Sequence, residues 1–427
     1  MRKKSGNMIG HGLKCILLLW LCLILLSGTA CAEELLELPF SQHESLYYWG
    51  TLPDGGLVLG GSKTSNNNDK SSDARLVCLN ADRTLRWEYT DTKKDGYQFV
   101  LHATVMQDGT IAAFEYTDSP WEEAVQFFTP KGKKARKTLN IPREKGLIYS
   151  VAPSYLIIYD ADSMDADSCF KYWTAVYDYK GKEITRYDGH IMKDGYGYIV
   201  QDNDELVLYG YDKLENSHAK IMKMDGLQDK TLWETVLDYL WSDTVSAELD
   251  YVLKTKDGGY IAKLKEERTV ANADLRTYRW RDALVKFDEE GHVMWINRES
   301  FGDTDQRISG LYTYDGKIIA QCEPQNESGW GFDPKVFLWF DETGKELGTT
   351  ELALDPANLL RTGKYLPPEN EGKDRAPLID VAYLIPMQDG LWALADCSIW
   401  EKQADGEQID CIIPDSEEYV MVKVPEL

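Results

Sequence analysis

Two turn signals recur together along most of this chain, and their repetition constrains the fold more than any other feature of the sequence. The first signal is an Asp-Gly pair between short segments of β-type residues. It occurs at Asp54-Gly55, Asp108-Gly109, Asp257-Gly258, Asp315-Gly316 and Asp389-Gly390, with weaker counterparts at Ala152-Pro153-Ser154 and Asp202-Asn203-Asp204. Because Asp-Gly supplies the positive φ angles of a tight type I′ turn, each pair predicts a hairpin of two antiparallel strands.

The second signal has the form apolar residue, Asp or Asn, two residues, Gly, and then an alternating strand that often ends in Trp. Copies begin at Asn80, Thr129, Asp178, Asp225, Asp288 and Asp341, and the copy at Asp225 is distorted. Asp in the first place and Gly in the fourth suit a type I turn, so each copy predicts a second hairpin. The copies recur about every fifty residues, within the range of propeller blades. The sequence therefore predicts an all-β fold, a single β-propeller of about seven four-stranded blades.

The two ends of the repeat region complement each other. The seventh unit has a hairpin at Asp389-Gly390 and a third strand at 419–424, but no fourth. The segment Leu35-Leu36-Glu37-Leu38 precedes the first unit and can supply the missing strand. We therefore expect the N- and C-terminal strands to pair and to close the ring, with residues 33–427 as one domain. Rings of six or eight blades remain alternatives, because the third and fourth units have weak turn signals.

The unit consensus reads Asp-Gly-Gly-aromatic-apolar, then apolar-Val-Lys-apolar-Asp-x-x-Gly-x-x-x-Trp, with its best copies at residues 54–90 and 257–298. It resembles the blades of bacterial secreted propellers of the quinoprotein-like class, often described as PQQ-like repeat proteins. This resemblance implies a fold and not a function. Quinone-dependent members carry vicinal cysteines and a calcium site beside the cofactor. Since this chain has no Cys-Cys pair and no C-x-x-C-H haem motif, we expect no cofactor.

The N-terminus has the three parts of an export signal. A basic start is followed by an apolar run from Cys15 to Leu26 and then by small residues. Ala30-Cys31-Ala32 fits a secretory peptidase site, which predicts a signal peptide at residues 1–32 and a secreted protein. Acylation of Cys31 would instead give a cell-surface lipoprotein, although Gly28 stands where an aliphatic residue is expected. The apolar run is short for a retained membrane span.

The chain is strongly acidic. Its formal net charge is −24, and removal of the signal takes away four cations and no acid, which gives −28. Such a surface repels nucleic acid and anionic lipids, so we expect no nucleic-acid partner and no membrane contact except a lipid anchor at Cys31. The charge favours solubility outside a cell, or a preference for cationic partners or divalent ions.

Five cysteines follow the predicted signal, an odd and sparse set without zinc or haem spacing. Cys78 replaces an apolar residue in a strand pattern and is predicted to lie in the core. Cys397 and Cys411 flank one loop of the last unit and form a possible disulfide in an oxidising compartment.

The spacers between the second and third strands of several units are long. They span 63–73, 116–123, 160–171, 265–281, 323–334 and 398–418. In a propeller these spacers share one face, here called the long-loop face, with the blade-to-blade connections, which include 355–377. Both tight hairpins of each blade lie on the opposite, tight-turn face. Insertions gathered on one face predict a binding face.

Aromatic residues in or beside these spacers are candidates for ligand binding. They are Trp121, Trp173, Tyr278, Trp280, Trp330 and Trp400. Such side chains can stack on sugars or pack against a protein partner. The alternative is that each of them packs against the ring itself.

Catalytic motifs are scarce: the chain has no G-x-S-x-G, no H-E-x-x-H and no P-loop, and no catalytic residue is assigned. Asp160, Asp162, Asp165 and Asp167 break the spacing of a calcium loop, which favours a solvated acidic segment, so no metal site is assigned. We therefore predict an exported, non-enzymatic propeller that binds a protein, peptide or glycan through its long-loop face. The alternatives are an extracellular glycosidase or lyase with paired carboxylates, and an envelope assembly scaffold.

Overall fold

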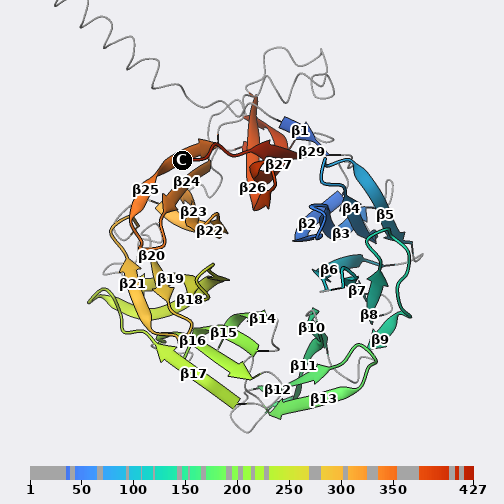
Figure 1. Cartoon of the computed structure of the whole chain (residues 1–427), viewed down its shortest axis with the longest axis horizontal. Coiled ribbons are helices and arrows are strands. Elements are labelled where there is room, and N and C mark those ends of the chain that lie inside the picture. Colours follow the sequence, from blue (N-terminus) through green and yellow to red (C-terminus); the bar gives the residue numbers. More distant parts are fainter. Residues whose placement is uncertain are drawn as a thin grey trace, which may run out of the picture.

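Seven sheets stand around a common centre in the computed structural model (Figure 1). It describes residues 35–38, 44–64, 71–92, 96–106, 108–118, 121–141, 147–151, 154–164, 170–188, 195–200, 205–212, 217–225, 230–268, 280–301, 306–324, 335–352, 375–402, 409–412 and 418–427. All regular elements in these ranges are strands, so none of them is an apolar helix that could span a bilayer. The prediction of an all-β propeller with seven blades is confirmed.

The first six blades are antiparallel four-stranded sheets whose strands follow one another in chain order from the centre outward. Blade 1 contains β2 (Glu44–Thr51), β3 (Leu57–Thr64), β4 (Ser72–Leu79) and β5 (Leu85–Asp91). Blade 2 contains β6 (Gln98–Val105), β7 (Ile111–Asp118), β8 (Trp121–Phe128) and β9 (Leu139–Ile141). Blade 3 contains β10 (Leu147–Val151), β11 (Leu156–Met164), β12 (Phe170–Tyr177) and β13 (Glu183–Asp188).

The next three blades repeat this arrangement. Blade 4 contains β14 (Gly195–Val200), β15 (Glu205–Tyr211), β16 (Ala219–Asp225) and β17 (Lys230–Val236). Blade 5 contains β18 (Thr244–Lys254), β19 (Tyr260–Arg268), β20 (Trp280–Phe287) and β21 (Val293–Asn297). Blade 6 contains β22 (Gln306–Tyr314), β23 (Lys317–Pro324), β24 (Lys335–Phe340) and β25 (Glu346–Leu352).

Blade 7 closes the ring with strands from both ends of the chain. Its order from the centre is β26 (Arg375–Met387), β27 (Gly390–Lys402), β29 (Glu418–Lys423) and β1 (Leu35–Glu37), and β28 (Ile409–Ile412) pairs with the end of β27. In this sheet Leu35 is opposite Val422 and Glu37 is opposite Val420. The predicted pairing of the two terminal strands is therefore confirmed, and the N-terminal strand supplies the outermost position.

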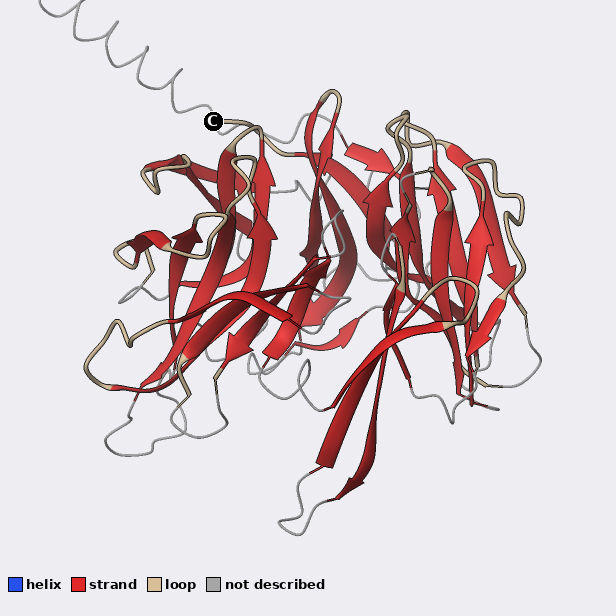
Figure 2. Cartoon of the chain, turned by 60° about the horizontal axis from the view of Figure 1, so that its bottom comes forward, coloured by secondary structure: helices blue, strands red, loops and turns tan. Residues whose placement is uncertain are grey.

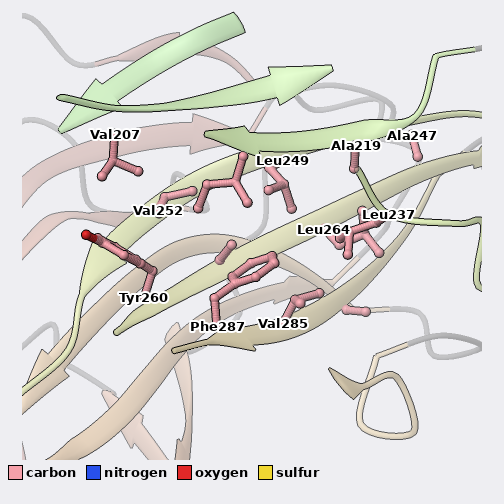
Figure 3. Packing of buried hydrophobic residues seen from close by; sticks show 13 residues of the cluster. Val207, Ala219, Leu237, Ala247, Leu249, Val252, Tyr260, Leu264, Val285 and Phe287 are labelled. Atoms are coloured by element: carbon pink, nitrogen blue, oxygen red, sulfur yellow. The ribbon is translucent and has the colours of Figure 1, made fainter. Parts of the chain in front are cut away.

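The hydrophobic cores lie between neighbouring blades. Between blades 4 and 5, for example, Val207 and Ala219 of blade 4 pack in one cluster with Leu249, Tyr260 and Phe287 of blade 5 (Figure 3). All five side chains are excluded from solvent. Because a sheet of this ring is covered on both faces, its second strand can be buried on both sides, as residues 57–62 of β3 are in blade 1.

The first hairpins differ in part from the type I′ turn expected of Asp-Gly. In blade 1, Leu52 N donates to Gly56 O across a three-residue turn, and Asp54 Oδ1 accepts from Gly56 N. Only Gly55 in this turn has a positive φ. The Asp side chain thus stabilises a type I turn that ends in a left-handed Gly, and blades 2 and 5 repeat these backbone bonds. Among the described Asp-Gly hairpins, the expected type I′ geometry occurs at 315–316 in blade 6.

The Trp that ends several consensus units ties its blade to the next one. The indole nitrogens of Trp87, Trp233 and Trp295 donate to the backbone oxygens of Pro130, Glu289 and Glu342, at 3.0, 3.0 and 2.9 Å. Each acceptor belongs to the second hairpin turn of the following blade. A Cβ on the Gly of that turn (Gly132, Gly291 or Gly344) would approach the indole to 2.5–2.7 Å. The consensus Gly therefore supplies both a positive φ and the room for the tryptophan.

The two faces of the ring contain different connections. An antiparallel meander places both hairpin turns of a blade at one end, and Figure 2 shows most of the described turns gathered there. The second-to-third-strand and blade-to-blade connections depart from the opposite end. One predicted spacer is much shorter than expected, because β7 continues to Asp118 and β8 starts at Trp121. The pairing of the two strands continues into 116–123 as far as Asp118, which is opposite Trp121.

The structure describes the side chain of Cys78 and the backbone of Cys397 and Cys411. Cys78 is fully buried, as predicted, and burial raises the pKa of its thiol to about 11. Cys411 on β28 is opposite Glu401, four positions along β27 from Cys397. At about 3.3 Å per residue this offset exceeds the span of a disulfide, so a bridge would require another register. The two side chains lie outside the described residues, and the disulfide stays a prediction.

Candidate functional site

The structure places the six predicted aromatic residues in different settings. Trp121, Trp173, Trp280 and Trp400 belong to strands β8, β12, β20 and β27 and not to loops, because these strands extend further than the sequence predicted. Tyr278 and Trp330 lie outside the described residues. Of the six, Trp280 has a described side chain, and it lies at the long-loop end of blade 5.

A short connection at this end joins β17 of blade 4 to β18 of blade 5 and is held by a buried carboxylate. Glu266 on β19 is 0% exposed and accepts hydrogen bonds from Leu240 N, at 2.7 Å, and from the Thr244 hydroxyl. Burial raises the pKa of Glu266, and these hydrogen bonds oppose the rise. Since one carboxylate oxygen accepts from the connection and the other from the first residue of β18, Glu266 holds residues 237–243 against β19.

The start of the same connection packs on blade 4. Leu237 N donates to Ala219 O at 2.8 Å, and Leu237 O lies 3.2 Å from His218 Nδ1. The His218 ring stacks on Tyr239 with centroids 4.3 Å apart and planes 1° from parallel. These contacts give His218 a structural role and orient Tyr239.

A second aromatic pair forms where this connection meets β20. Arg281 is opposite Glu266 in the sheet, and its Cζ lies 4.6 Å from the ring centroid of Trp241. The Arg281 guanidinium also pairs with the carboxylate of Asp243. Arg281 is 8% exposed, whereas Asp243 is exposed, so the charge of the buried guanidinium is balanced by an acid at the surface.

A third pair lies one residue away on the other face of the same sheet. Lys265 Nζ lies 4.1 Å from the ring centroid of Trp280 and donates to Glu248 Oε1 at 2.8 Å. Trp280 is opposite Glu267, and Glu267 Oε2 accepts from Ser246 Oγ at 3.1 Å. The indole is therefore held beside one ammonium and two carboxylates. All of these groups are half-buried, so part of each reaches solvent.

We call the set Tyr239, Trp241, Lys265, Trp280 and Arg281 the blade 4–5 cluster. Its indoles can stack on a sugar ring or pack against a protein, and the adjoining ammonium and carboxylate groups can bond hydroxyl or peptide groups. Sequence reasoning found Trp280 and missed Tyr239, Trp241 and Arg281. The available signal was the run Tyr239-Leu240-Trp241 directly after the strand that contains Trp233.

A group of three potential metal ligands occurs in the second hairpin turn of blade 5. Asp288, Glu290 and His292 place their ligand atoms within 4.8 Å of one another. Asp288 already accepts from His292 N at 2.7 Å to close the turn, and the His292 side chain is 78% exposed. The three residues are therefore close together because they belong to one hairpin turn, which the Asp288 carboxylate stabilises. The acidic segment that begins with Asp160 and Asp162 runs into residues outside the described ranges.

Comparisons with known proteins found similar solved structures but no matching family. No protein-family model matches it, and no curated protein matches it. Among solved structures it is similar to an acylaminoacyl peptidase of Pyrococcus horikoshii, with 12% identity, a TM-score of 0.46 and coverage of 87% of this chain and 53% of that chain. It is also similar to Drosophila plexin A in complex with semaphorin 1b, with 7% identity, a TM-score of 0.42 and coverage of 92% and 86%.

A third similar structure is the WD40 domain of SCAP from fission yeast, with 9% identity, a TM-score of 0.37 and coverage of 92% of this chain and 97% of that chain. The chain spans about half the length of the peptidase it resembles.

Proposed function

We propose that this protein is an exported, non-enzymatic β-propeller that binds a protein, peptide or glycan through its long-loop face. The observation that carries the proposal is the blade 4–5 cluster, in which two indoles, an ammonium and a guanidinium lie within one connection and two strand ends. Interfaces and sugar sites commonly combine such aromatic rings with a few fixed polar groups.

The way the cluster is held supports a role in recognition. The buried carboxylate of Glu266 fixes the connection that contains Trp241, and the stack of Tyr239 on His218 fixes its start. Rings that are positioned before a ligand arrives lose little conformational entropy on binding. The pre-organisation of Tyr239 and Trp241 therefore supports a role in binding for this end of blade 5.

Export and class are further parts of the proposal. The segment at residues 1–32 has the composition of a signal peptide, which favours a secreted protein, with a lipoprotein anchored at Cys31 as the second form. The repeat consensus favours the quinoprotein-like class of secreted propellers. Both points are open to direct tests, the first by N-terminal sequencing of the exported protein.

The binding proposal is tested by screening the purified protein against a glycan array and a phage-displayed peptide library. The double variant Trp241→Ala, Trp280→Ala is expected to lose at least about tenfold in affinity for any ligand found, because it removes both aromatic platforms. The control Trp295→Phe changes a tryptophan on the tight-turn face and should bind normally. Unchanged binding by the double variant contradicts the proposal, and cleavage of an array glycan would favour the glycosidase or lyase alternative.

A further inference from the structure

The outer strand of blade 5 is the last strand of its sheet. β21 pairs with β20 on one side, and no described strand pairs with its other side, which faces away from the ring centre (Figure 1). Such an edge presents N–H and C=O groups to which another extended chain can add as a further strand. Every blade has an outer edge of this kind, so the side chains decide which edge is open to a partner.

β21 differs from the other outer strands in its lack of charge. Its sequence is Val293-Met294-Trp295-Ile296-Asn297. The other described outer strands of five residues or more are β5, β13, β17 and β25, and each of them contains at least two charged residues. Charged side chains on an edge strand hinder the addition of another chain. The edge of β21 lacks the charges that hinder strand addition at the other four.

The exposed side chains of β21 are apolar. Met294 is 62% exposed, the most among the large apolar residues of the described ranges, and Ile296 is 38% exposed. The side chains of Trp295 and Asn297 donate to two backbone oxygens of blade 6, at 2.9 and 3.2 Å. Since successive side chains of a strand point to opposite faces, Met294 and Ile296 share the face turned away from blade 6. An added strand with apolar residues at alternate positions can pack against both of them.

The tight-turn end of this edge is acidic. Glu289 and Glu290 are exposed in the turn that leads into β21. Lys223 of blade 4 interacts electrostatically with Glu289, but its ammonium pairs with a carboxylate of its own blade at 2.6 Å. At the other end of the strand, Arg298 and Glu299 supply one charge of each sign. A partner strand therefore meets negative charge at the tight-turn end and no net charge along the rest of the edge.

The charge of the whole chain bears on which partner fits. A second copy would bring together two bodies that each have a formal net charge of −24, and these bodies repel each other. A partner with basic residues is instead attracted by the same charge. The acidic end of the edge adds a local attraction for such residues.

We propose that the outer edge of β21 binds an extended segment of a partner protein, which adds to blade 5 as a further strand. The segment has apolar residues at alternate positions and Lys or Arg at one end. Antiparallel pairs are slightly more stable than parallel ones, and β21 runs away from the acidic turn, so the basic residues lie at the C-terminal end of the segment. This edge shares no residue with the blade 4–5 cluster, and the proposal goes beyond the function proposed for that cluster.

The test titrates the whole chain with the peptide acetyl-Thr-Val-Thr-Val-Thr-Val-Lys-Lys-amide in an isothermal titration calorimeter. Two further versions have N-methyl groups on all three valines or on all three threonines. Because backbone groups of alternate residues point to opposite edges of a strand, only one version loses the hydrogen bonds to β21. That version should bind at least about tenfold more weakly than the other. Replacing Lys-Lys by Glu-Glu should also weaken binding about tenfold.

Variants of the chain test whether β21 is the edge that binds. Met294→Lys places a charge in the middle of this edge and should weaken peptide binding about tenfold. Leu232→Lys is the matched control, because Leu232 is an apolar residue of another outer strand, β17, and is 41% exposed. Since both residues are exposed, neither substitution should disturb folding.

The proposal is overturned if the original chain does not bind the peptide, if the two methylated peptides bind equally, or if both lysine variants lose affinity equally. Dimerisation of the chain that Met294→Lys abolishes in analytical ultracentrifugation also overturns it, because a second copy then occupies the edge. The variant Trp241→Ala, Trp280→Ala should bind the peptide normally. Failure of the edge proposal and failure of the proposed function are therefore distinguishable in the same set of proteins.

Discussion

The seam between blades 5 and 6 and the seam between blades 7 and 1 are joined in opposite ways. At the first seam, Trp295 of the outer strand of blade 5 reaches forward over Gly344 and donates to Glu342 O. At the second, Arg83 of blade 1 reaches back to blade 7. Its Nη2 lies 2.8 Å from both carboxylate oxygens of Asp389, and its Cζ lies 4.2 Å from the Trp392 ring centroid.

The difference follows from how the ring is closed. A consensus outer strand can supply the forward-reaching tryptophan, but the outer strand of blade 7 is Leu35–Glu37 from the other end of the chain. At the position of the consensus Gly, blade 1 has Arg83, with a φ of 67°. The side chain makes contacts across the seam that a Gly could not make. At the closing seam, therefore, an ion pair between Arg83 and Asp389 takes the place of the tryptophan hydrogen bond. Arg83 adopts a strained left-handed backbone conformation to make it.

The largest effect is expected for Gly344→Ala at the blade 5–6 seam. The new Cβ would lie 2.7 Å from Trp295 Cδ2, and the residue has a φ of +83°. We expect the free energy of unfolding to fall by about 3 kcal/mol, because overpacking adds to backbone strain. The control Gly258→Ala has a similar φ of +89°, but its nearest neighbour is Glu289 Oε2 at 3.5 Å. Its loss should be about 1 kcal/mol. If urea denaturation gives the two variants equal losses of unfolding free energy, the contact between Trp295 and Gly344 does not stabilise the seam.

A pair of substitutions at Arg83 sharpens the comparison with the closing seam. Arg83→Ala keeps the strained backbone and loses both contacts, and should cost about 1 to 2 kcal/mol of stability. Arg83→Gly loses the same contacts and relieves the strain, so it should unfold within about 0.5 kcal/mol of the original chain. The prediction fails if thermal or urea denaturation ranks Ala as the more stable of the two.

A smaller effect is expected when only the hydrogen bond of the aromatic tie is removed. Trp295→Phe keeps a ring near Gly344 but loses the donor to Glu342 O, and should cost about 1 kcal/mol. Adding Gly344→Ala to this variant should cost less than in the original chain, because the smaller ring leaves room for a Cβ. Strict additivity of the two changes in a double-mutant cycle would rule out the contact between them.

The seam between blades 1 and 2 adds a pH-dependent term. His102 packs against Trp49 with ring centroids 5.0 Å apart, and burial lowers its pKa from 6.5 to about 4. Below pH 6.5 the unfolded chain takes up a proton that the folded chain does not, so stability falls as the pH drops towards 4. His102→Phe keeps the aromatic contact and removes the titrating group. Between pH 7.5 and 5.5 its free energy of unfolding should fall by about 1 kcal/mol less than that of the original chain. Identical pH profiles of unfolding free energy would contradict this assignment.

The sequence predicts the ring well because its signals are local. Asp257-Gly258 and Asp288 to Gly291 mark turns within a few residues, and Leu35-Leu36-Glu37 reads as a strand without a partner. The turn type was predicted less well, since it depends on where a strand ends relative to the Asp-Gly pair. In blade 5 the pair occupies the last two places of a three-residue turn, whereas in blade 6 it forms the whole turn.

Most residues of the blade 4–5 cluster could not be predicted from the sequence. Trp241 and Arg281 are forty positions apart and meet because β19 and β20 pair in the register that places Arg281 opposite Glu266. That register cannot be read from composition or spacing. The tryptophans Trp233 and Trp295, by contrast, recur with the repeat unit, and the structure shows that each of them bonds the next blade.

The measurement that tests the central claim most directly is hydrogen exchange of the whole chain with and without the ligand obtained from the glycan and peptide screens. The claim is that the tight-turn face contains the ties that build the ring and that the long-loop face binds the ligand. Binding should slow exchange in 237–243 and at the long-loop ends of β19 and β20. Slower exchange at the turns 288–292 and 341–345, with none at 237–243, would contradict it.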